Sequence, residues 1–132
     1  MIAGLGARVH LFARPEVRER MTTLWRDVLD CAVRELDFGL PHPSLLVSFP
    51  DGSSFSVEFS DSAPQVSDEP PGYANVRKGA WIEFRTDDLA GTNARLDNAG
   101  VPSFSHPASP HRYFVDACGQ VFRVLDLNYR GP

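Results

Sequence analysis

Side chains suited to binding a ligand alternate with apolar ones in the run 80–85, Ala-Trp-Ile-Glu-Phe-Arg. An alternation with a period of two places Trp81, Glu83 and Arg85 on one face of a strand and the apolar residues on the other. An indole can stack on a planar or cationic group, and a carboxylate can receive a cation. One face of this strand is therefore predicted to build a core, and the other to hold a ligand.

Four further polar side chains belong to the same hypothesis because each lies on a predicted strand. His10 is the polar residue at the middle of the run 7–13, and Glu58 stands among serines on the polar face of 54–59. Arg123, in the run 121–125, can bind a carboxylate or phosphate through two parallel hydrogen bonds. Tyr113 is the remaining polar aromatic residue, and a shift of one residue in register decides whether it faces the ligand.

The elements that would carry these side chains occur twice in the same order. A strand, a helix and three strands are predicted first at 7–13, from Pro15, and at 31–36, 44–49 and 54–59. The second set is predicted at 79–85, from 86 to Gly100, and at 101–106, 112–115 and 121–125. Residues at helical spacing are predicted to form one buried face on each helix: Val17, Met21, Leu24, Trp25 and Val28 on the first, and Leu89, Thr92, Leu96 and Ala99 on the second. The short polar side chains at 86–88 can accept from the free amides at the start of the second helix. Between the two sets, the segment from about 61 to 78 is rich in proline and polar residues and is predicted to be a linker or lid. The fold class is therefore α+β.

Composition narrows the possible partners. The 132 residues are 42% hydrophobic and 23% charged, which is typical of a single domain with a real core. A net charge of -4 does not suit binding to a phosphate backbone, so no nucleic acid is expected. No apolar run approaches the roughly 20 residues of a membrane span, and we expect a cytoplasmic protein with no membrane partner. Cys31 and Cys118 show no CxxC spacing and are expected to be reduced.

Tandem strand-helix-three-strand modules, with the turn Asp-Ala-Cys-Gly-Gln at 116–120 before the last strand, resemble the vicinal oxygen chelate superfamily. This superfamily includes glyoxalase I, extradiol dioxygenases and bleomycin-resistance proteins. The resemblance extends from Val9 to Leu127. It implies one glyoxalase-like domain over 1–132, with modules at about 7–60 and 79–128. It also implies a half-open eight-stranded cup with its helices outside, a ligand cavity within, and a homodimer.

In the metalloenzymes of this superfamily, the first and last strands of each module supply the metal ligands. The matching positions here are His10 and Glu58 in the first module, and Trp81 and Arg123 in the second. An indole has no lone pair to offer, and a guanidinium is permanently charged. At an effective dielectric of about 20, two unit charges about 4 Å apart interact by roughly 4 kcal/mol, and a divalent ion doubles that repulsion. No metal or other cofactor is therefore predicted, although a register shift that recruits Glu83 or Asp126 stays open.

The sequence supports two functional hypotheses, one a binding protein and the other an enzyme. The first is a binding protein related to bleomycin-resistance members, which holds an organic ligand with planar and charged parts between Trp81 and Arg123 and sequesters it. The Ala80-Trp81 pair resembles an Ala-Trp pair at the start of the same strand in those members. The alternative is a metal-dependent lyase or isomerase of the glyoxalase type that uses His10 and Glu58. Two plainer interpretations also stay open: an internal ion-pair network of Arg123 with the glutamates, and a cup that serves dimerisation alone.

Overall fold

The structure is a computed structural model that describes residues 1–76 and 79–132. The chain divides into two compact units, residues 1–64 and 65–132. The last two residues of the predicted linker, 77 and 78, lie outside the described residues. Because each unit is described by itself, the closure of eight strands into one cup stays a prediction, and so does the assignment of the whole chain to a single domain.

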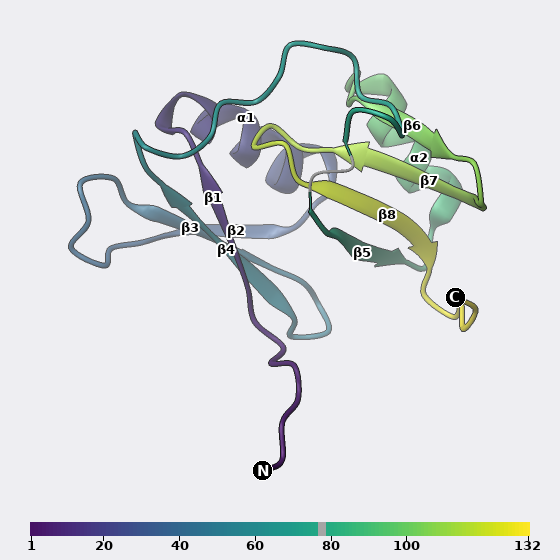
Figure 1. The fold of residues 1–132 in the computed structure, drawn as a ribbon, viewed down its shortest axis with the longest axis horizontal. Coiled ribbons are helices and arrows are strands. Elements are labelled where there is room, and N and C mark those ends of the chain that lie inside the picture. Colours follow the sequence, from purple (N-terminus) through teal and green to yellow (C-terminus); the bar gives the residue numbers. More distant parts are fainter. Residues whose placement is uncertain (77–78) are drawn as a thin grey trace. The chain divides into compact units, whose positions relative to one another are not determined.

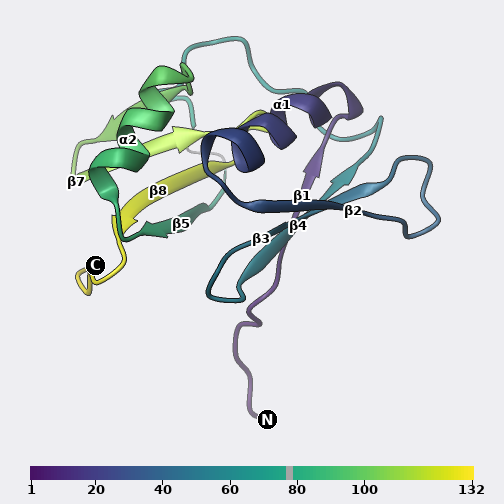
Figure 2. The ribbon, with the colours of Figure 1, turned by 180° about the vertical axis from the view of Figure 1, so that it is seen from behind.

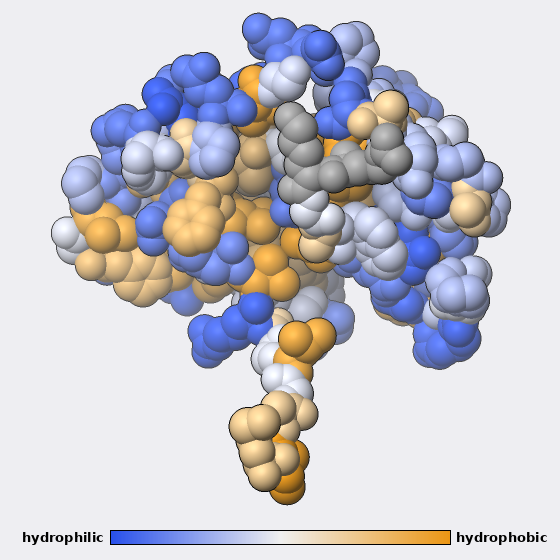
Figure 3. Space-filling model, viewed as in Figure 1, coloured by the Kyte–Doolittle hydropathy of each residue, from blue (hydrophilic) through white to orange (hydrophobic). Residues whose placement is uncertain are grey.

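The first unit is a four-stranded mixed sheet with a helical segment on one face (Figures 1 and 2). Its strands have the spatial order β1-β4-β3-β2, in which β1 and β4 are parallel and the other pairs antiparallel. Their bounds are Val9–Ala13 (β1), Ala32–Leu36 (β2), Ser44–Ser48 (β3) and Ser54–Phe59 (β4). Ahead of β1, residues 1–8 form an exposed tail (Figure 3).

The helical segment of the first unit changes type along its length. It comprises a 3₁₀ turn η1 (Pro15–Val17), the α-helix α1 (Arg18–Thr22) and a π-helical segment η2 (Thr23–Val28). Four members of the predicted apolar stripe, Val17, Met21, Leu24 and Trp25, are buried, and the fifth, Val28, is only partly buried. Trp25 packs edge-on against Phe55 of β4, with 4.9 Å between the ring centroids. The period of the stripe therefore located the helix, but its single helical type was not correct.

The second unit repeats this arrangement with the strand order β5-β8-β7-β6, in which β5 and β8 are parallel (Figure 1). Its elements are β5 (Trp81–Thr86), α2 (Leu89–Asn98), β6 (Ser103–His106), β7 (Ser109–Val115) and β8 (Val121–Asp126). Helix α2 lies across one face of this sheet (Figure 2). Together the two units form two four-stranded mixed sheets with a few helices, so the predicted α+β class is confirmed.

Both ends of α2 are capped as the sequence predicts. The Asp88 side chain accepts a hydrogen bond from the Gly91 amide at 2.9 Å, which satisfies one of the free donors of the first turn. At the other end Gly100 has a φ of +67°, and the amides of Gly100 and Val101 donate to the carbonyls of Asp97 and Leu96. This is a Schellman motif, in which the left-handed residue is usually glycine.

Two predictions about the second unit were wrong in detail. The strand predicted over 112–115 begins at Ser109, so Pro110 lies inside β7. Proline is tolerated there because Pro110 precedes the residues of β7 that pair with β8 and lies beside a register shift in β6. On α2, Thr92 and Leu96 are buried as predicted, but Leu89 and Ala99 are exposed at the two ends of the helix.

Each sheet has a face against its helix and an opposite face, which we call the helix-distal face. In the first unit Arg18 of α1 lies over the Phe59 ring, so β4 directs Phe59 to the helix and Glu58 to the distal face. In the second unit the Thr92 hydroxyl of α2 donates to the Thr86 hydroxyl, which places Trp81, Glu83 and Arg85 on the distal face of β5. In the described part of the chain, no helix is long and apolar enough to cross a membrane.

The Asp88 cap leads to a stability prediction. Asp88→Ala removes the acceptor for the Gly91 amide, and we expect the free energy of unfolding to fall by about 1 kcal/mol in urea titrations. The matched control is Asp87→Ala, which removes an exposed neighbouring carboxylate outside the cap. Equal losses in the two variants would contradict the assigned cap.

Candidate functional site

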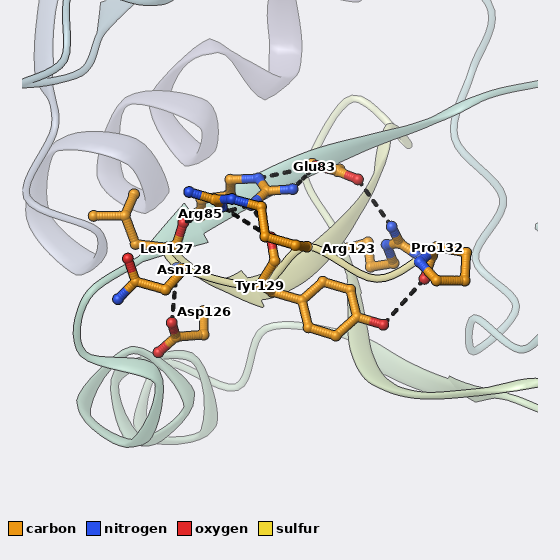
Figure 4. A network of polar contacts seen from close by, with 9 residues as sticks. Glu83, Arg85, Arg123, Asp126, Leu127, Asn128, Tyr129 and Pro132 are labelled. Atoms are coloured by element: carbon orange, nitrogen blue, oxygen red, sulfur yellow. Dashed lines mark hydrogen bonds and ion pairs between the residues drawn. The ribbon is translucent and has the colours of Figure 1, made fainter.

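The helix-distal face of the second unit carries a charged cluster that joins β5 to β8 (Figure 4). Glu83 lies between two guanidinium groups. Its Oε1 accepts from Nη2 of Arg123 at 2.8 Å, and its Oε2 accepts from Nη2 of Arg85 at 2.8 Å and from Nε of Arg85 at 3.0 Å. Arg123 is buried, with 6% of its surface exposed. Its guanidinium therefore does bind a carboxylate, but that carboxylate is the protein's own.

The parallel register of β5 on β8 brings this cluster together. Glu83 is the direct partner of Arg123 across the β5–β8 ladder, and Tyr113 is the partner of Arg123 across the β7–β8 ladder. Residues paired in this way point to the same face of the sheet. Tyr113 consequently lies on the helix-distal face, which answers the register question that the sequence left open, and only 3% of its surface is exposed.

Trp81 covers the buried arginine. The guanidinium carbon of Arg123 lies 4.1 Å from the centroid of the indole, which is the geometry of a cation–π contact. The indole also meets the Tyr113 ring edge-on at 6.5 Å between centroids. The two side chains stack directly on each other, so the space predicted for a ligand between Trp81 and Arg123 is closed in this structure, and that ligand position stays a prediction. Trp81 itself remains 45% exposed.

The charges of the cluster determine which ligands it can attract. Partial burial raises the pKa of Glu83, but the hydrogen bonds and charges of Arg85 and Arg123 outweigh it, so the pKa lies below its ordinary value of 4.5. Two guanidinium groups and one ionised carboxylate leave a net charge of one positive unit. Glu83 is thus already occupied by two cations, and the prediction that it receives a cationic group is not supported by its contacts.

The C-terminal segment 127–132 is attached to this cluster, which the sequence reading did not anticipate. Nη1 of Arg85 donates to the Tyr129 carbonyl at 2.7 Å (Figure 4). The Tyr129 ring meets His111 of β7 edge-on at 4.6 Å. Arg85 on the polar face of a strand was the available signal, but the backbone carbonyl that it binds in this segment carries no sequence signature.

The helix-distal face of the first unit holds a second group of polar side chains. The His10 imidazole accepts or donates at both nitrogens: Nδ1 is 2.6 Å from Oγ of Ser56, and Nε2 is 3.4 Å from Oε1 of Glu58. The Phe12 ring meets the imidazole edge-on at 5.1 Å. The side chains of His10 and Glu58 are 40% and 30% exposed. The sequence analysis named these two residues and missed Ser56, although Ser56 is the direct partner of His10 between β1 and β4.

The six predicted site residues therefore fall into two groups, with two residues in the first unit and four in the second. The parallel strand pair of each unit, β1 with β4 and β5 with β8, carries every member of its group except Tyr113, which lies on β7. The internal ion-pair network that the sequence left open is present for Arg123 and Glu83, whereas Glu58 contacts His10 in the first unit.

Comparison with solved structures decides the fold. TnmS3, an antibiotic-binding protein from Streptomyces sp. CB03234, matches with a TM-score of 0.62 over 96% of this chain and 98% of its own, at 18% identity. Glyoxalase I of Leishmania major matches with 0.66 over 94% and 87%, at 12% identity. The fosfomycin-resistance protein FosX of Listeria monocytogenes, complexed with Mn(II) and sulfate, matches with 0.59 over 94% and 92%, at 15% identity.

The chain has the vicinal oxygen chelate fold. The resemblance inferred from the sequence is thereby confirmed at the level of the fold, which is what identities of this size can show. Neither the protein-family models nor the curated proteins contain a match to the sequence.

The donor set of the second unit does not suit the metal site that the family resemblance implies. Among the described residues, no group of three or more His, Cys, Asp or Glu side chains is placed to hold a metal ion. The indole of Trp81 and the guanidinium of Arg123 occupy the two positions of the second module that the resemblance assigns to metal ligands. Neither group has a lone pair for a cation. In addition, the two glutamate oxygens closest to Arg123 already accept from arginines.

The two thiols and a depression beside β6 and β7 offer little chemistry of their own. Burial raises the pKa of Cys31 to about 11, and burial followed by the Asp116 charge raises that of Cys118 still further. Both thiols are therefore protonated near neutral pH and are poor nucleophiles. A depression of about 290 Å³ beside β6 and β7 is lined in part by Arg112, whose guanidinium is already held by Ser103 and Asp97.

The lowered pKa of Glu83 predicts a change of stability with pH. Because the folded-state pKa lies below 4.5, the ionised carboxylate contributes stability above that pH and loses it as the pH falls through the folded-state value. We expect Glu83→Gln to lower the free energy of unfolding at pH 7 by roughly 0.5–1 kcal/mol, a figure reduced for the partial exposure of Glu83. The difference from the original protein should shrink below pH 4.5 in thermal melts.

The control is Glu19→Gln, since Glu19 is exposed and forms no ion pair in the part of the chain that the structure describes. A gap between the original protein and Glu83→Gln that stays constant from pH 7 to pH 3 would show that the ion pairs of Glu83 do not support the fold.

Proposed function

We propose that this chain is a binding protein that sequesters small planar organic molecules carrying an acidic group, among them antibiotics. The observation that carries the proposal is the half-exposed indole of Trp81 stacked on the buried guanidinium of Arg123. The stack holds the indole in one orientation, and an aromatic surface that is already fixed loses little conformational freedom when a ligand binds.

The charge beneath the indole favours an acidic ligand. Arg85 and Arg123 together outweigh Glu83 by one unit, and Arg123 lies in a buried position where charge is poorly screened. Nε of Arg123 is also buried without a hydrogen-bond partner. A planar ring on the indole would gain about 0.5–1.5 kcal/mol from stacking beyond its buried area, and its anionic substituent would gain from the nearby positive charge.

Two of the similar structures support a binding or resistance role in different ways. TnmS3 is described as an antibiotic-binding protein, and FosX as a fosfomycin-resistance protein with bound Mn(II). The donor set of the second unit here favours the first kind of activity, because Trp81 and Arg123 occupy the ligand positions. A homodimer and a cytoplasmic location are part of this proposal and stay predictions.

The second candidate is a metal-dependent lyase or isomerase of the glyoxalase type. The contact between His10 and Glu58 favours it, because both side chains are partly exposed and both are suitable metal ligands. Elemental analysis after dialysis against zinc, manganese or nickel separates the two candidates. About one equivalent of metal, lost in both His10→Ala and Glu58→Gln, would support the enzyme; less than about a tenth of an equivalent would support the binding protein.

The binding role predicts a specific loss on Trp81→Ala. Naphthalene-2-sulfonate and naphthalene-2-carboxylate are expected to raise the melting temperature of the original protein, because a ligand of the native state must stabilise it. We expect Trp81→Ala to remove this rise, and the cationic analogue 2-naphthylmethylamine to produce a smaller one. Trp25 is fully buried, so quenching of tryptophan fluorescence by these probes would report on Trp81.

The matched control is Phe38→Ala, which removes another exposed aromatic side chain, in the first unit. This variant should keep the full thermal shift. A preference for the amine over the two acids, or an equal shift in Trp81→Ala, would contradict the proposed site.

A further inference from the structure

We propose that Ser56, His10 and Glu58 form a nucleophilic site that accepts acyl groups from small esters. The proposal concerns the first unit alone and goes beyond the binding role of the second. Three side chains from two neighbouring strands make a continuous hydrogen-bonded chain there, from a hydroxyl through an imidazole to a carboxylate. A nucleophile hydrogen-bonded to a base, with the base held by a third group, is the recognised signature of this chemistry.

The distances assign a role to each atom. A carboxylate accepts only, so the hydrogen between His10 and Glu58 belongs to Nε2 of the imidazole. In a neutral imidazole Nδ1 then carries the lone pair, and it lies 2.6 Å from Oγ of Ser56. In that tautomer the hydroxyl donates its hydrogen to Nδ1. This is the ground state in which a histidine can remove the proton of a serine, with the longer 3.4 Å contact to Glu58 orienting the ring.

The fold holds these atoms in place. His10 and Ser56 are direct partners across the parallel ladder of β1 and β4, and Glu58 follows two residues later on the same face. Phe12, the partner of Glu58, packs edge-on against the imidazole and restricts its rotation. Because His10 and Glu58 are partly exposed, a small substrate can reach the cluster.

A cation on the same face can respond to the charge that develops on a substrate. Arg34 of β2 is paired with Leu46, and Leu46 is paired with Ser56. The strand spacing of about 4.8 Å places the Arg34 backbone roughly 10 Å from that of Ser56, within the combined reach of a guanidinium and a small substrate. Arg34 is exposed and forms no ion pair with any residue that the structure describes. It is therefore the group we assign to the oxyanion of the tetrahedral intermediate.

The reaction balances with the ester and water as its only reactants. Oγ of Ser56 attacks the ester carbonyl as its proton passes to Nδ1 of His10, and a carbon–oxygen bond forms. The bond to the alcohol breaks next, and the departing oxygen takes the proton back from Nδ1, which leaves an acyl-serine. Water then hydrolyses the acyl-serine by the same proton transfers, releasing the acid and restoring the hydroxyl.

The test uses the full chain with diisopropyl fluorophosphate and with p-nitrophenyl acetate, both in excess EDTA. We expect the fluorophosphate to modify Ser56 by displacing fluoride, with the position identified by mass spectrometry of peptides. The acetate should release a burst of nitrophenolate close to one equivalent. His10→Ala is expected to slow both reactions by about 100-fold or more, the usual contribution of a general base, and added imidazole should restore part of the rate.

Matched variants keep the outcome clear. Ser54→Ala removes the hydroxyl two residues before Ser56 on the same face of β4 and should leave the modification unchanged, whereas Ser56→Ala should abolish it. Arg34→Ala should lower the burst rate while leaving the folded structure intact by circular dichroism. Modification spread equally over Ser54 and Ser56, a rate unaffected in His10→Ala, or ester hydrolysis that stops in EDTA and returns with zinc would each overturn the proposal.

Discussion

The second unit depends on one constraint, which is that a buried guanidinium must have a partner. Arg123 lies almost wholly out of water on an inner strand of its sheet, where an unpaired charge is destabilising. Glu83 supplies the partner because the parallel register places it beside Arg123. The indole of Trp81 covers the guanidinium of Arg123. The positions of three strands are thus coupled to one ion pair, since Tyr113 on β7 completes the same surface.

The same strand pattern produces different chemistry in the two units. Where the second unit has an indole and a guanidinium, the first has the imidazole of His10 and the carboxylate of Glu58. Strand β4, which carries Glu58, also supplies the hydroxyl of Ser56. Both groups lie on the face opposite the helices, and both are made by the parallel pair of strands. The repeated topology therefore acts as a scaffold that fixes where side chains meet, while the residue types alone decide what they can do.

The charges also explain why the cluster of the second unit does not suit a metal ion. Arg85 and Arg123 satisfy both oxygens of Glu83, so the one acid on that face is committed to the protein. Arg85 in turn binds the carbonyl of Tyr129 and so ties the C-terminal segment to the sheet. A cation would meet repulsion there, and an anion or an aromatic ring would not.

The sequence by itself determined the repeated strand and helix order, a short polar cap at the start of α2 and Gly100 at its end, and the faces on which Glu58, Trp81 and Glu83 lie. These follow from local periodicity and turn chemistry, which depend on residues close together in the chain. Only the tertiary structure decided that Arg123 stacks on Trp81 and pairs with Glu83, that Ser56 meets His10, and that Tyr113 faces the same side. Those contacts join residues 32 to 46 positions apart, and the register of parallel strands, which sets them, leaves no local mark in a single sequence.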